Sequence, residues 1–411
     1  MEPATSAAYS LLTAAAVRER CHRLLALGLA GKLQHFRVEL DRLDAAADLV
    51  IDLMLRTYPQ LDVPLHSRWR HFTVDGEDRW ARLAAGSAWA NRAERARAAF
   101  DLAILSVLLD AGADARWRYR DALTGRSFAR SEGLALASLA MFAAGAVSND
   151  RSSPLRVDAS ALLGMTPELL AGHFQVSDLN PLPGLVGRVR LLRRLGEVVA
   201  ANAYLFARAD RPRPGGLFDY LLETSDGGAI AAPRVLGEIL RHLGPIWPGR
   251  LEIAGVGLGD CWRHPALETD DETTELVPLH KLSQWLAYSL IEPLEAAGLS
   301  VTDIDGLTGL AEYRNGGLML DAGVLVLRDP DANNVVHDVG ATLVVEWRAL
   351  TVALLDRLAT TVRQRLGMDG STLPLVKLLQ GGSWAAGRQI AQLKRADGGP
   401  PLAVRSDGTV F

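Results

Sequence analysis

Apolar residues recur at helical spacing along most of the chain. This periodicity predicts α-helices over residues 7–30, 38–58, 91–110, 131–142, 184–207, 233–243, 281–298 and 341–366. Ser131 is expected to cap the fourth of these helices and Gly298 to end the seventh. Alternating apolar and polar residues around a Thr-Gly turn predict a hairpin over residues 117–128, and residues 323–327 are expected to form a strand.

These helices favour a mainly α fold. We expect one large helical unit with a few short β-hairpins, because the Pro- and Gly-rich breaks are too short to separate independent domains. After Gly367 the sequence becomes Gly-rich and turn-prone. The predicted organisation is therefore a helical, catalytic-type domain over residues 1–366 and a Gly-rich C-terminal segment over residues 367–411, packed on it as a lid or a meander.

Composition narrows the class of protein. Of the 411 residues, 49% are hydrophobic and 22% are charged, which is typical of a packed globular protein. The net charge of −4 argues against nucleic acid or an anionic membrane as a partner. Two cysteines, Cys21 and Cys261, cannot form a disulfide framework, and the sequence lacks the patterns of a signal peptide and of a membrane-spanning helix. We therefore expect a cytoplasmic protein.

Residues 307–317, LTGLAEYRNGG, place an acid, a phenol, a guanidinium and an amide in consecutive positions after an apolar lead-in. A polar cluster at the edge of an apolar scaffold is typical of a ligand pocket. Glu312 is the candidate catalytic carboxylate, and Tyr313 and Arg314 are candidates for substrate binding.

Lys281 is one of only four lysines in a chain that otherwise uses arginine, which suggests that an amine is needed at this position. On the predicted helix, Trp285 shares a face with Lys281 because the two are four residues apart. Lys281 is therefore the second catalytic candidate, and Trp285 a candidate for substrate binding. A lysine whose stem lies along the start of a core helix, with its amine in solvent, would give the same pattern.

Residues 64–80, PLHSRWRHFTVDGEDRW, gather histidines, arginines and aromatic rings. Arginine binds phosphate through paired N–H groups, and an aromatic ring offers a face for stacking. Candidates for binding an anionic or aromatic ligand are His66, Arg68, Arg70, His71 and Phe72. An edge strand with a turn at Val-Asp-Gly would explain the same residues without a ligand.

Residues 255–265, GVGLGDCWRHP, hold two more candidates. The glycines lack the spacing of a dinucleotide-binding loop, and Cys261 and His264 alone make a poor metal site. Asp260 and Trp262 can still face a pocket, since glycines let the backbone approach a ligand closely. We expect neither a metal nor a cofactor.

Glu346 and Arg348 lie inside an apolar helix pattern. A buried charge needs a partner, so both residues either form structural ion pairs or line a cleft that binds substrate. Neither interpretation is favoured. The sequence contains no nucleophile elbow, P-loop or HExxH motif, which argues against serine hydrolases, kinases and zinc proteases.

The order of these segments resembles the uracil catabolism protein 4 family over nearly the whole chain. The stretches that carry the resemblance are PLHSRWRHF, AAFDLAILSVLLDAG, SEGLALASLAMF, RPGGLFDYL, GDCWRHPA, VPLHKLSQWLAYSLIEPL and LTGLAEYRNGGLMLDAGVL. The resemblance implies a role in a uracil-degrading route that passes through a ribosylurea-type intermediate.

A more distant resemblance is to the queuosine salvage nucleotide N-glycosidases, an all-helical family. The lysine that begins one of its helices is similar to Lys281, and its LTxFADYRVPQ motif is similar to residues 307–317. Its ExEIR-type helix is similar to the segment with Glu346 and Arg348, and its iPLxxxR helix entry is similar to the segment with Arg188.

Two departures separate this chain from that second family. Glu312 stands in place of an aspartate, and Asn-Gly-Gly in place of VPQ, which we expect to open the wall beside the carboxylate. The resemblances imply hydrolysis of the N-glycosidic bond of ribosylurea or its 5′-phosphate, a small nucleoside- or nucleotide-derived substrate. Glu312 would activate water, while Lys281 would keep it ionised or bind a phosphate or a ribose hydroxyl. The alternative is a ligand-binding regulator or scaffold protein of the same pathway.

Overall fold

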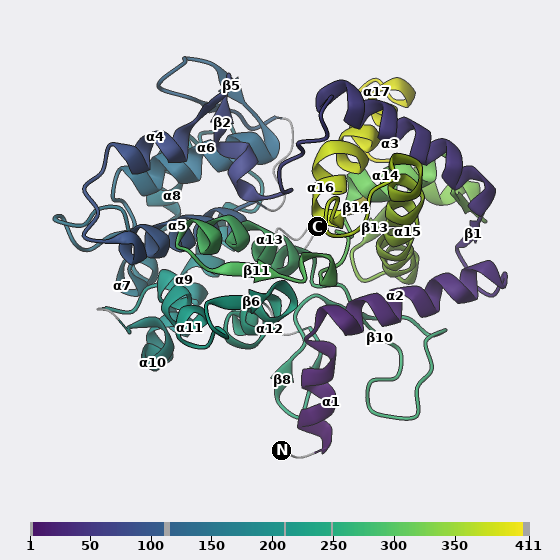
Figure 1. Cartoon of the computed structure of the whole chain (residues 1–411), viewed down its shortest axis with the longest axis horizontal. Helices are drawn as coiled ribbons and strands as arrows, with labels where there is room; N and C mark the ends of the chain where they lie inside the picture. Colours follow the sequence, from purple (N-terminus) through teal and green to yellow (C-terminus); the bar gives the residue numbers. More distant parts are fainter. Residues whose placement is uncertain (1–2, 111–115, 209–210, 248–249, 406–411) are drawn as a thin grey trace.

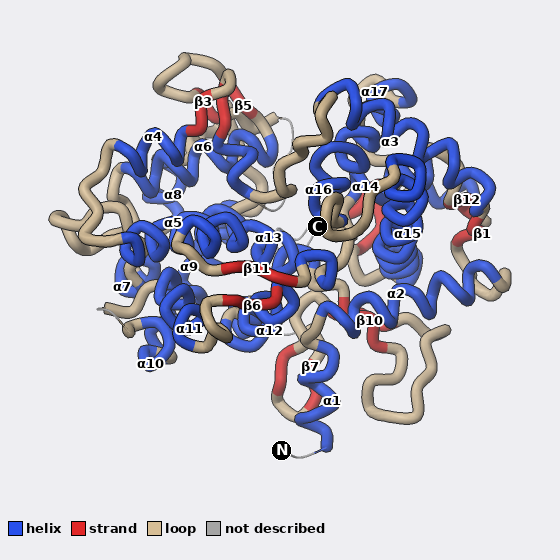
Figure 2. The backbone as a smooth tube through the Cα atoms, viewed as in Figure 1, coloured by secondary structure: helices blue, strands red, loops and turns tan. Residues whose placement is uncertain are grey.

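Helices dominate the chain and confirm the mainly α fold (Figures 1 and 2). The computed structural model describes residues 3–110, 116–208, 211–247 and 250–405. Its α-helices are α1 (Pro3–Leu11), α2 (Ala14–Leu29), α3 (Leu43–Thr57), α4 (Arg79–Ala85), α5 (Arg92–Leu108), α6 (Arg130–Ala143), α7 (Ala159–Leu163), α8 (Pro167–His173), α9 (Leu185–Ala201), α10 (Ala203–Phe206), α11 (Leu217–Glu223), α12 (Ala232–His242), α13 (Lys281–Ala296), α14 (Tyr313–Asp321), α15 (Thr342–Leu366), α16 (Leu375–Leu378) and α17 (Trp384–Lys394).

The strands are short, and those that the structure describes pair two by two. The antiparallel pairs are β1 (Phe36–Val38) with β12 (Leu325–Leu327), β2 (Thr73–Val74) with β3 (Glu77–Asp78), β4 (Tyr119–Arg120) with β5 (Ser127–Phe128), β7 (Glu252–Ile253) with β8 (Val256–Gly257), and β9 (Cys261–Arg263) with β10 (Leu276–Pro278). The parallel pairs are β6 (Ala229–Ala231) with β11 (Ser300–Thr302), and β13 (Val336–Asp338) with β14 (Ala403–Arg405). The hairpin and the strand predicted from the sequence are thus confirmed.

The hydrophobic core draws on nearly the whole chain. The main cluster of buried apolar side chains runs from Leu12 to Leu402, and a small second cluster joins α1 to the strands near Cys261. In Figure 1, α13 lies between a group of helices that includes α5, α6 and α9 and a second group that includes α3, α14, α15 and α17. α13 packs against α5 and α12, while α15 packs against α2, α3 and α14. The site described below lies at the N-terminal ends of α13 and α14.

Several helices begin or divide at other residues than the sequence predicted. The helix expected over residues 7–30 is two helices, because the hydroxyl of Thr13 accepts the N–H of Ala16 and begins α2. The helix expected from residue 38 begins five residues later, after a strand and a 3-10 turn. The prediction that Ser131 caps a helix is wrong, because α6 begins at Arg130 and Ser131 lies in its first turn.

The Gly-rich segment after Gly367 is largely helical, which the turn-prone sequence did not indicate. It forms α16, a π-helical turn over Leu379–Ser383, and α17 (Figure 1). The π-helical turn and α17 pack against α3 and α14, and α16 packs against α15. Gly382 lies against Val50 of α3, where a Cβ would not fit. Gly381, Gly382 and Gly387 therefore allow close packing against neighbouring elements, whereas Gly367 and Gly398 take up the positive φ of turns.

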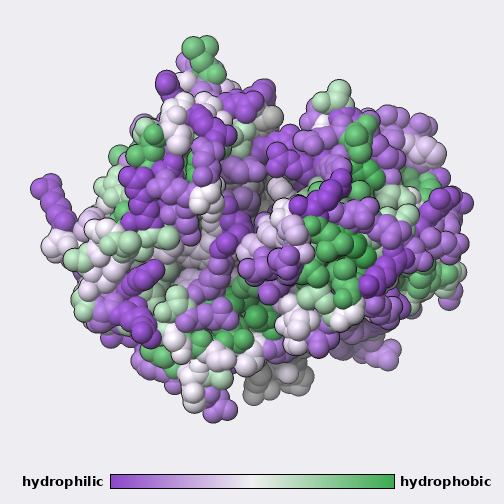
Figure 3. Space-filling model, turned by 45° about the horizontal axis from the view of Figure 1, so that its top comes forward, coloured by the Kyte–Doolittle hydropathy of each residue, from purple (hydrophilic) through white to green (hydrophobic). Residues whose placement is uncertain are grey.

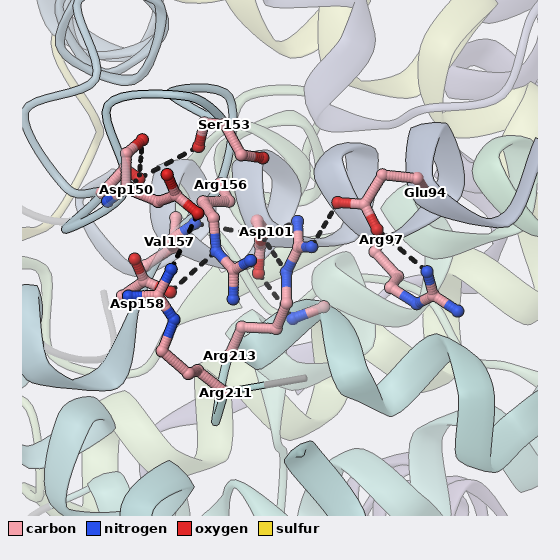
Figure 4. Close-up of polar contacts among 12 residues, drawn as sticks. Glu94, Arg97, Asp101, Asp150, Ser153, Arg156, Val157, Asp158, Arg211 and Arg213 are labelled. Atoms are coloured by element: carbon pink, nitrogen blue, oxygen red, sulfur yellow. Dashed lines mark hydrogen bonds and ion pairs between the residues drawn. The ribbon is translucent and has the colours of Figure 1, made fainter. Parts of the chain in front are cut away.

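A buried polar network explains the RPGG part of the segment RPGGLFDYL (Figure 4). Asp101 of α5 is fully buried and accepts from Arg213 at 2.9 and 2.6 Å and from the backbone N–H of Gly215 at 2.6 Å. Arg213 also pairs with Glu94 on the same helix. The network fixes the entry to α11 against α5, a structural role separate from the candidate site.

Hydrophilic residues prevail on the face of the molecule seen in Figure 3, with small hydrophobic patches between them. Within the described ranges, none of the helices combines the length and the apolar character needed to cross a membrane.

Candidate active site

The N-terminus of α13 is positioned by Asp260, which precedes β9. One carboxylate oxygen accepts the backbone N–H of Lys281 at 2.9 Å, and the main-chain oxygen accepts the N–H groups of Leu279 and His280 at 2.9 and 3.2 Å. The indole N–H of Trp262 donates to the other carboxylate oxygen at 2.6 Å. Asp260 and Trp262 therefore hold Lys281 at the helix start, and no ligand is needed to explain their polar atoms.

Arg348 of α15 completes this arrangement from the opposite side. Its two terminal nitrogens donate to the two carboxylate oxygens of Asp260 at 2.9 and 2.8 Å, and both side chains are buried. Burial alone would raise the pKa of Asp260, but the Arg348 guanidinium holds this pKa well below its usual range. The pair joins α15 to the turn before α13, two segments far apart in the sequence.

Glu312 is the N-cap residue of α14. Its carboxylate oxygens accept the backbone N–H groups of Arg314 at 2.7 Å and of Asn315 at 2.6 Å. These bonds fix the position of a carboxylate that is only 7% exposed. Burial raises the pKa of Glu312, while the two N–H donors and the charge of Lys281 oppose the shift. The carboxylate therefore has a pKa closer to neutrality than an exposed glutamate, which suits a general base.

The Lys281 amine is the unusual group in the site. The side chain is half-buried, and its nitrogen makes no hydrogen bond or ion pair with any residue that the structure describes. Burial lowers the pKa of Lys281, and the carboxylates that oppose this most are those of Glu312 and Asp110. The sequence candidates Lys281 and Glu312 thus interact electrostatically although 31 positions separate them.

Asp110 was not singled out from the sequence. It follows α5, and its carboxylate accepts from Arg68 at 2.5 Å and from the hydroxyl of Ser131 at 3.1 Å. A carboxylate at the end of an apolar helix, before an Ala-Gly break, was the available sequence signal. With Glu312 it places two carboxylates around the amine of Lys281.

The segment of residues 66–72 forms one wall beside these groups. The ring of Trp285 lies 6.3 Å from that of His66, 5.7 Å from that of His71 and 5.5 Å from the guanidinium carbon of Arg68. Arg68 is fully buried and donates to Ser106 and Asp110. The wall is therefore aromatic, and the charge of Arg68 is engaged within the protein.

Two candidates from the same segment point elsewhere. Arg70 pairs with Glu292 in the C-terminal half of α13, and Phe72 is buried with its ring 5.6 Å from that of Trp69. Alternate residues of this 3-10 helix face different sides, so not all five candidates meet one ligand.

Glu346 is also separated from the amine of Lys281. It is fully buried, it accepts the N–H groups of His35 and Phe36 at 3.2 and 2.9 Å, and its second oxygen lies 3.2 Å from the ring nitrogen of His264. Glu346 and Arg348 are two positions apart on α15 and therefore face different directions. Glu346 holds β1 in place, which is the structural alternative left open by the sequence.

Tyr313 and Arg314 line a cavity of about 530 Å³ next to Glu312. Trp384 of α17 and Ser131 of α6 also line it. Trp384 lies 6.2 Å from the ring of His66, and Ser131 bonds to Asp110, so the cavity adjoins the Lys281 site. Neither residue was a sequence candidate. Trp384 lies in the Gly-rich segment, which was expected to be a surface lid or meander, and Ser131 was expected to cap a helix.

The Asn-Gly-Gly tripeptide does not open the wall beside Glu312. Asn315 is buried, where it accepts from Ser383 at 2.9 Å and donates to the main-chain oxygen of Leu310 at 3.3 Å. Gly316 lies against the indole of Trp347, and the indole N–H donates to the carbonyl oxygen of Gly316 at 3.0 Å. The tripeptide forms the first turn of α14, and its small residues make room for Trp347.

The assembled site offers a fixed carboxylate, an amine without a polar partner in the described part of the chain, and an aromatic wall beside a cavity. Among the residues described, no three His, Cys, Asp or Glu side chains come together as metal ligands would. Such a site can stabilise positive charge on a substrate and activate a water molecule.

Comparison with known proteins gives the family. Residues 10–411 match the model of a family described as a protein of unknown function, DUF1688. Uracil catabolism protein 4 of Lachancea kluyveri is 38% identical over 413 residues, covering 93% of both chains. Protein urg3 of Schizosaccharomyces pombe is 36% identical over 417 residues, covering 99% of this chain and 100% of the relative. With this near-complete coverage at such identities, the chain belongs to the DUF1688 family.

Proposed function

We propose that the protein acts in uracil catabolism as a hydrolase of the N-glycosidic bond of ribosylurea or its 5′-phosphate. The observation that carries the proposal is the charge interaction between Glu312, a buried and fixed carboxylate, and Lys281, whose amine has no polar partner among the described residues. The name of the relative from Lachancea kluyveri supports the pathway. The likeness to queuosine salvage N-glycosidases supports the reaction and rests on sequence motifs.

The reaction requires two kinds of help. As the bond from the anomeric carbon to nitrogen breaks, positive charge develops on the ribose ring, and the Glu312 carboxylate stabilises it. The same carboxylate takes a proton from the water whose oxygen bonds to the anomeric carbon. The leaving nitrogen gains one proton for the one that Glu312 takes from water, so one water molecule is consumed and the products are urea and ribose or ribose 5-phosphate.

Lys281 has two tasks in this scheme. Its positive charge favours the ionised form of Glu312, against the effect of burial. Its unused N–H groups bind a ribose hydroxyl of the substrate, which orients the anomeric carbon toward the carboxylate. Trp285 and His66 form the surface against which the substrate lies.

One observation favours the alternative of a ligand-binding regulator or scaffold of the same pathway. Both oxygens of Glu312 already accept backbone N–H groups, and this capping role stabilises α14 whether or not the residue is catalytic. A binding protein would use the same pocket and would tolerate a neutral capping residue at position 312.

The test is incubation of the pure protein with synthetic ribosylurea and its 5′-phosphate, with urea release as the readout. Glu312→Gln retains an oxygen that can cap α14, yet we expect it to lower turnover by about 10²–10⁴-fold, as loss of a general base does. Asp78→Asn is the matched control, since Asp78 caps α4 through Ala81 and lies outside this site. Unchanged turnover in Glu312→Gln contradicts the catalytic role, and binding without urea release by the wild type favours the alternative.

A further inference from the structure

The cavity beside Glu312 is strongly cationic. Arginine side chains from four segments line it, at positions 118, 130, 314 and 388, against the two carboxylates of Glu132 and Asp397. The cavity joins α6, on the left in Figure 1, to α14 and α17 on the right. Its volume of about 530 Å³ is that of a small-molecule site. An excess of guanidinium groups in such a cavity favours an anionic ligand.

Arg130 is held in place by the backbone rather than by a partner. Its φ of +53° lies in the left-handed region, which residues other than glycine rarely adopt. Its guanidinium makes no hydrogen bond or ion pair with any residue in the described ranges. Strain of this kind is found where a side chain must be aimed at a ligand. The next residue, Ser131, bonds to Asp110, which connects Arg130 to the Lys281 site.

Arg314 extends the cationic surface toward Glu312. One terminal nitrogen donates to the carbonyl oxygen of Gly398 at 2.8 Å, and the guanidinium carbon lies 4.8 Å from the centre of the Tyr313 ring. Its Nε atom is buried and has no hydrogen-bond partner among the residues that the structure describes. A buried N–H without a partner costs free energy unless a ligand accepts from it.

Arg388 closes the far side of the cavity. Its guanidinium lies 5.8 Å from the centre of the Trp384 ring, and its nearest carboxylate oxygen, on Glu132, is 3.7 Å away. This separation is longer than a hydrogen bond, so no residue in the described ranges accepts a hydrogen bond from the Arg388 guanidinium. An anion in the cavity would have Arg130, Arg314 and Arg388 around it.

We propose that this cavity binds the phosphate group of the substrate, so that the phosphorylated compound is hydrolysed in preference to the free nucleoside derivative. This inference rests on the proposed function. A dianion with three terminal oxygens matches several guanidinium groups at once, because each offers paired N–H donors. The sugar would then lie between the phosphate and Glu312, with the anomeric carbon toward the Glu312 carboxylate and a ribose hydroxyl toward Lys281.

The experiment measures binding by calorimetry with the full chain, using ribose 5-phosphate, ribose and inorganic phosphate as probes. We expect ribose 5-phosphate to bind more tightly than either other probe. Arg130→Ala and, separately, Arg388→Ala should weaken its binding roughly 10- to 100-fold, as loss of a charge-assisted hydrogen bond does. Arg95→Ala is the matched control, because Arg95 is exposed and lies on the wall of a different cavity.

Two outcomes would overturn the phosphate subsite: equal binding of ribose and ribose 5-phosphate, and undiminished binding of ribose 5-phosphate in both arginine variants. Equal binding of inorganic phosphate and ribose 5-phosphate would contradict the placement of the sugar between the phosphate and Glu312. Urea release separates this inference from the proposed function. Hydrolysis of both substrates at equal rates contradicts the subsite alone, whereas tight, arginine-dependent binding of ribose 5-phosphate without urea release contradicts the hydrolase alone.

Discussion

Arg348 donates to both carboxylate oxygens of Asp260, and Asp260 in turn accepts the backbone N–H of Lys281. These hydrogen bonds connect the long helix α15 to the first residue of α13 through the buried carboxylate of Asp260. The ion pair does not contact the cavity beside Glu312, since neither of its residues lines that cavity. Its contribution is to position the Lys281 amine relative to Glu312.

Asp260→Asn should therefore destabilise the protein strongly. The change removes the negative charge that faces a buried guanidinium, and removal of one partner from a buried ion pair typically costs about 3–5 kcal/mol. Asp48→Asn provides the control, because Asp48 pairs with Arg365 at the surface and is 67% exposed, so that a loss below about 1 kcal/mol is expected. Urea denaturation measures both, and equal losses in the two variants would contradict the structural role of Asp260.

Gly387→Ala tests whether α17 positions the candidate site. A Cβ at residue 387 would overlap the carbonyl oxygen of Arg314, so α17 or α14 must shift. Overpacking of this kind costs about 1–3 kcal/mol, and we expect a loss of urea release because α14 begins beside Glu312. Gly237→Ala in α12 is the control, since no atom lies within 4 Å of a Cβ there and alanine should stabilise that helix by about 0.5–1 kcal/mol. Unaltered activity and stability in Gly387→Ala would mean that the two helices are not rigidly packed.

The sequence allowed prediction of what is local and not of what depends on tertiary packing. The helix that begins at Lys281 and the polar group at Glu312 follow from residue types and spacing within short segments. The bond from Arg348 to Asp260 joins positions 88 residues apart, and no periodicity could indicate it. The helices after Gly367 were missed for a related reason. Glycine disfavours isolated helices, but here α3 and α14 approach so closely that only glycine fits.

Stability should depend on pH through His66. Burial lowers the pKa of His66 to about 4, although its hydrogen bond with Gln380 opposes the shift. The unfolded chain, with a histidine pKa near 6.5, binds more protons between pH 4 and pH 6.5. The stabilising contribution of neutral His66 is therefore complete above about pH 6.5 and is lost as the pH falls toward 4, by up to about 3 kcal/mol.

The measurement for His66 is the unfolding free energy at a series of pH values in wild type and His66→Asn. Asparagine retains a donor for Gln380 and does not titrate, so the variant should lose less stability between pH 6.5 and pH 4. Parallel curves would show that His66 does not carry this dependence. Subtraction of the two curves removes the contribution of His71, whose pKa is also lowered by burial.

Lys281→Met should separate function from stability. The half-buried amine of Lys281 has no hydrogen-bond or ion-pair partner in the described part of the chain, and burial lowers its pKa. The charged amine therefore lowers the free energy of unfolding. Methionine has a similar length without the charge, and we expect an unfolding free energy equal to or higher than that of the wild type, together with a large loss of urea release. Lys32→Met, at an exposed position, should change neither quantity. A fall in both stability and activity would instead assign Lys281 a structural role, because a group kept for binding substrate is dispensable for folding.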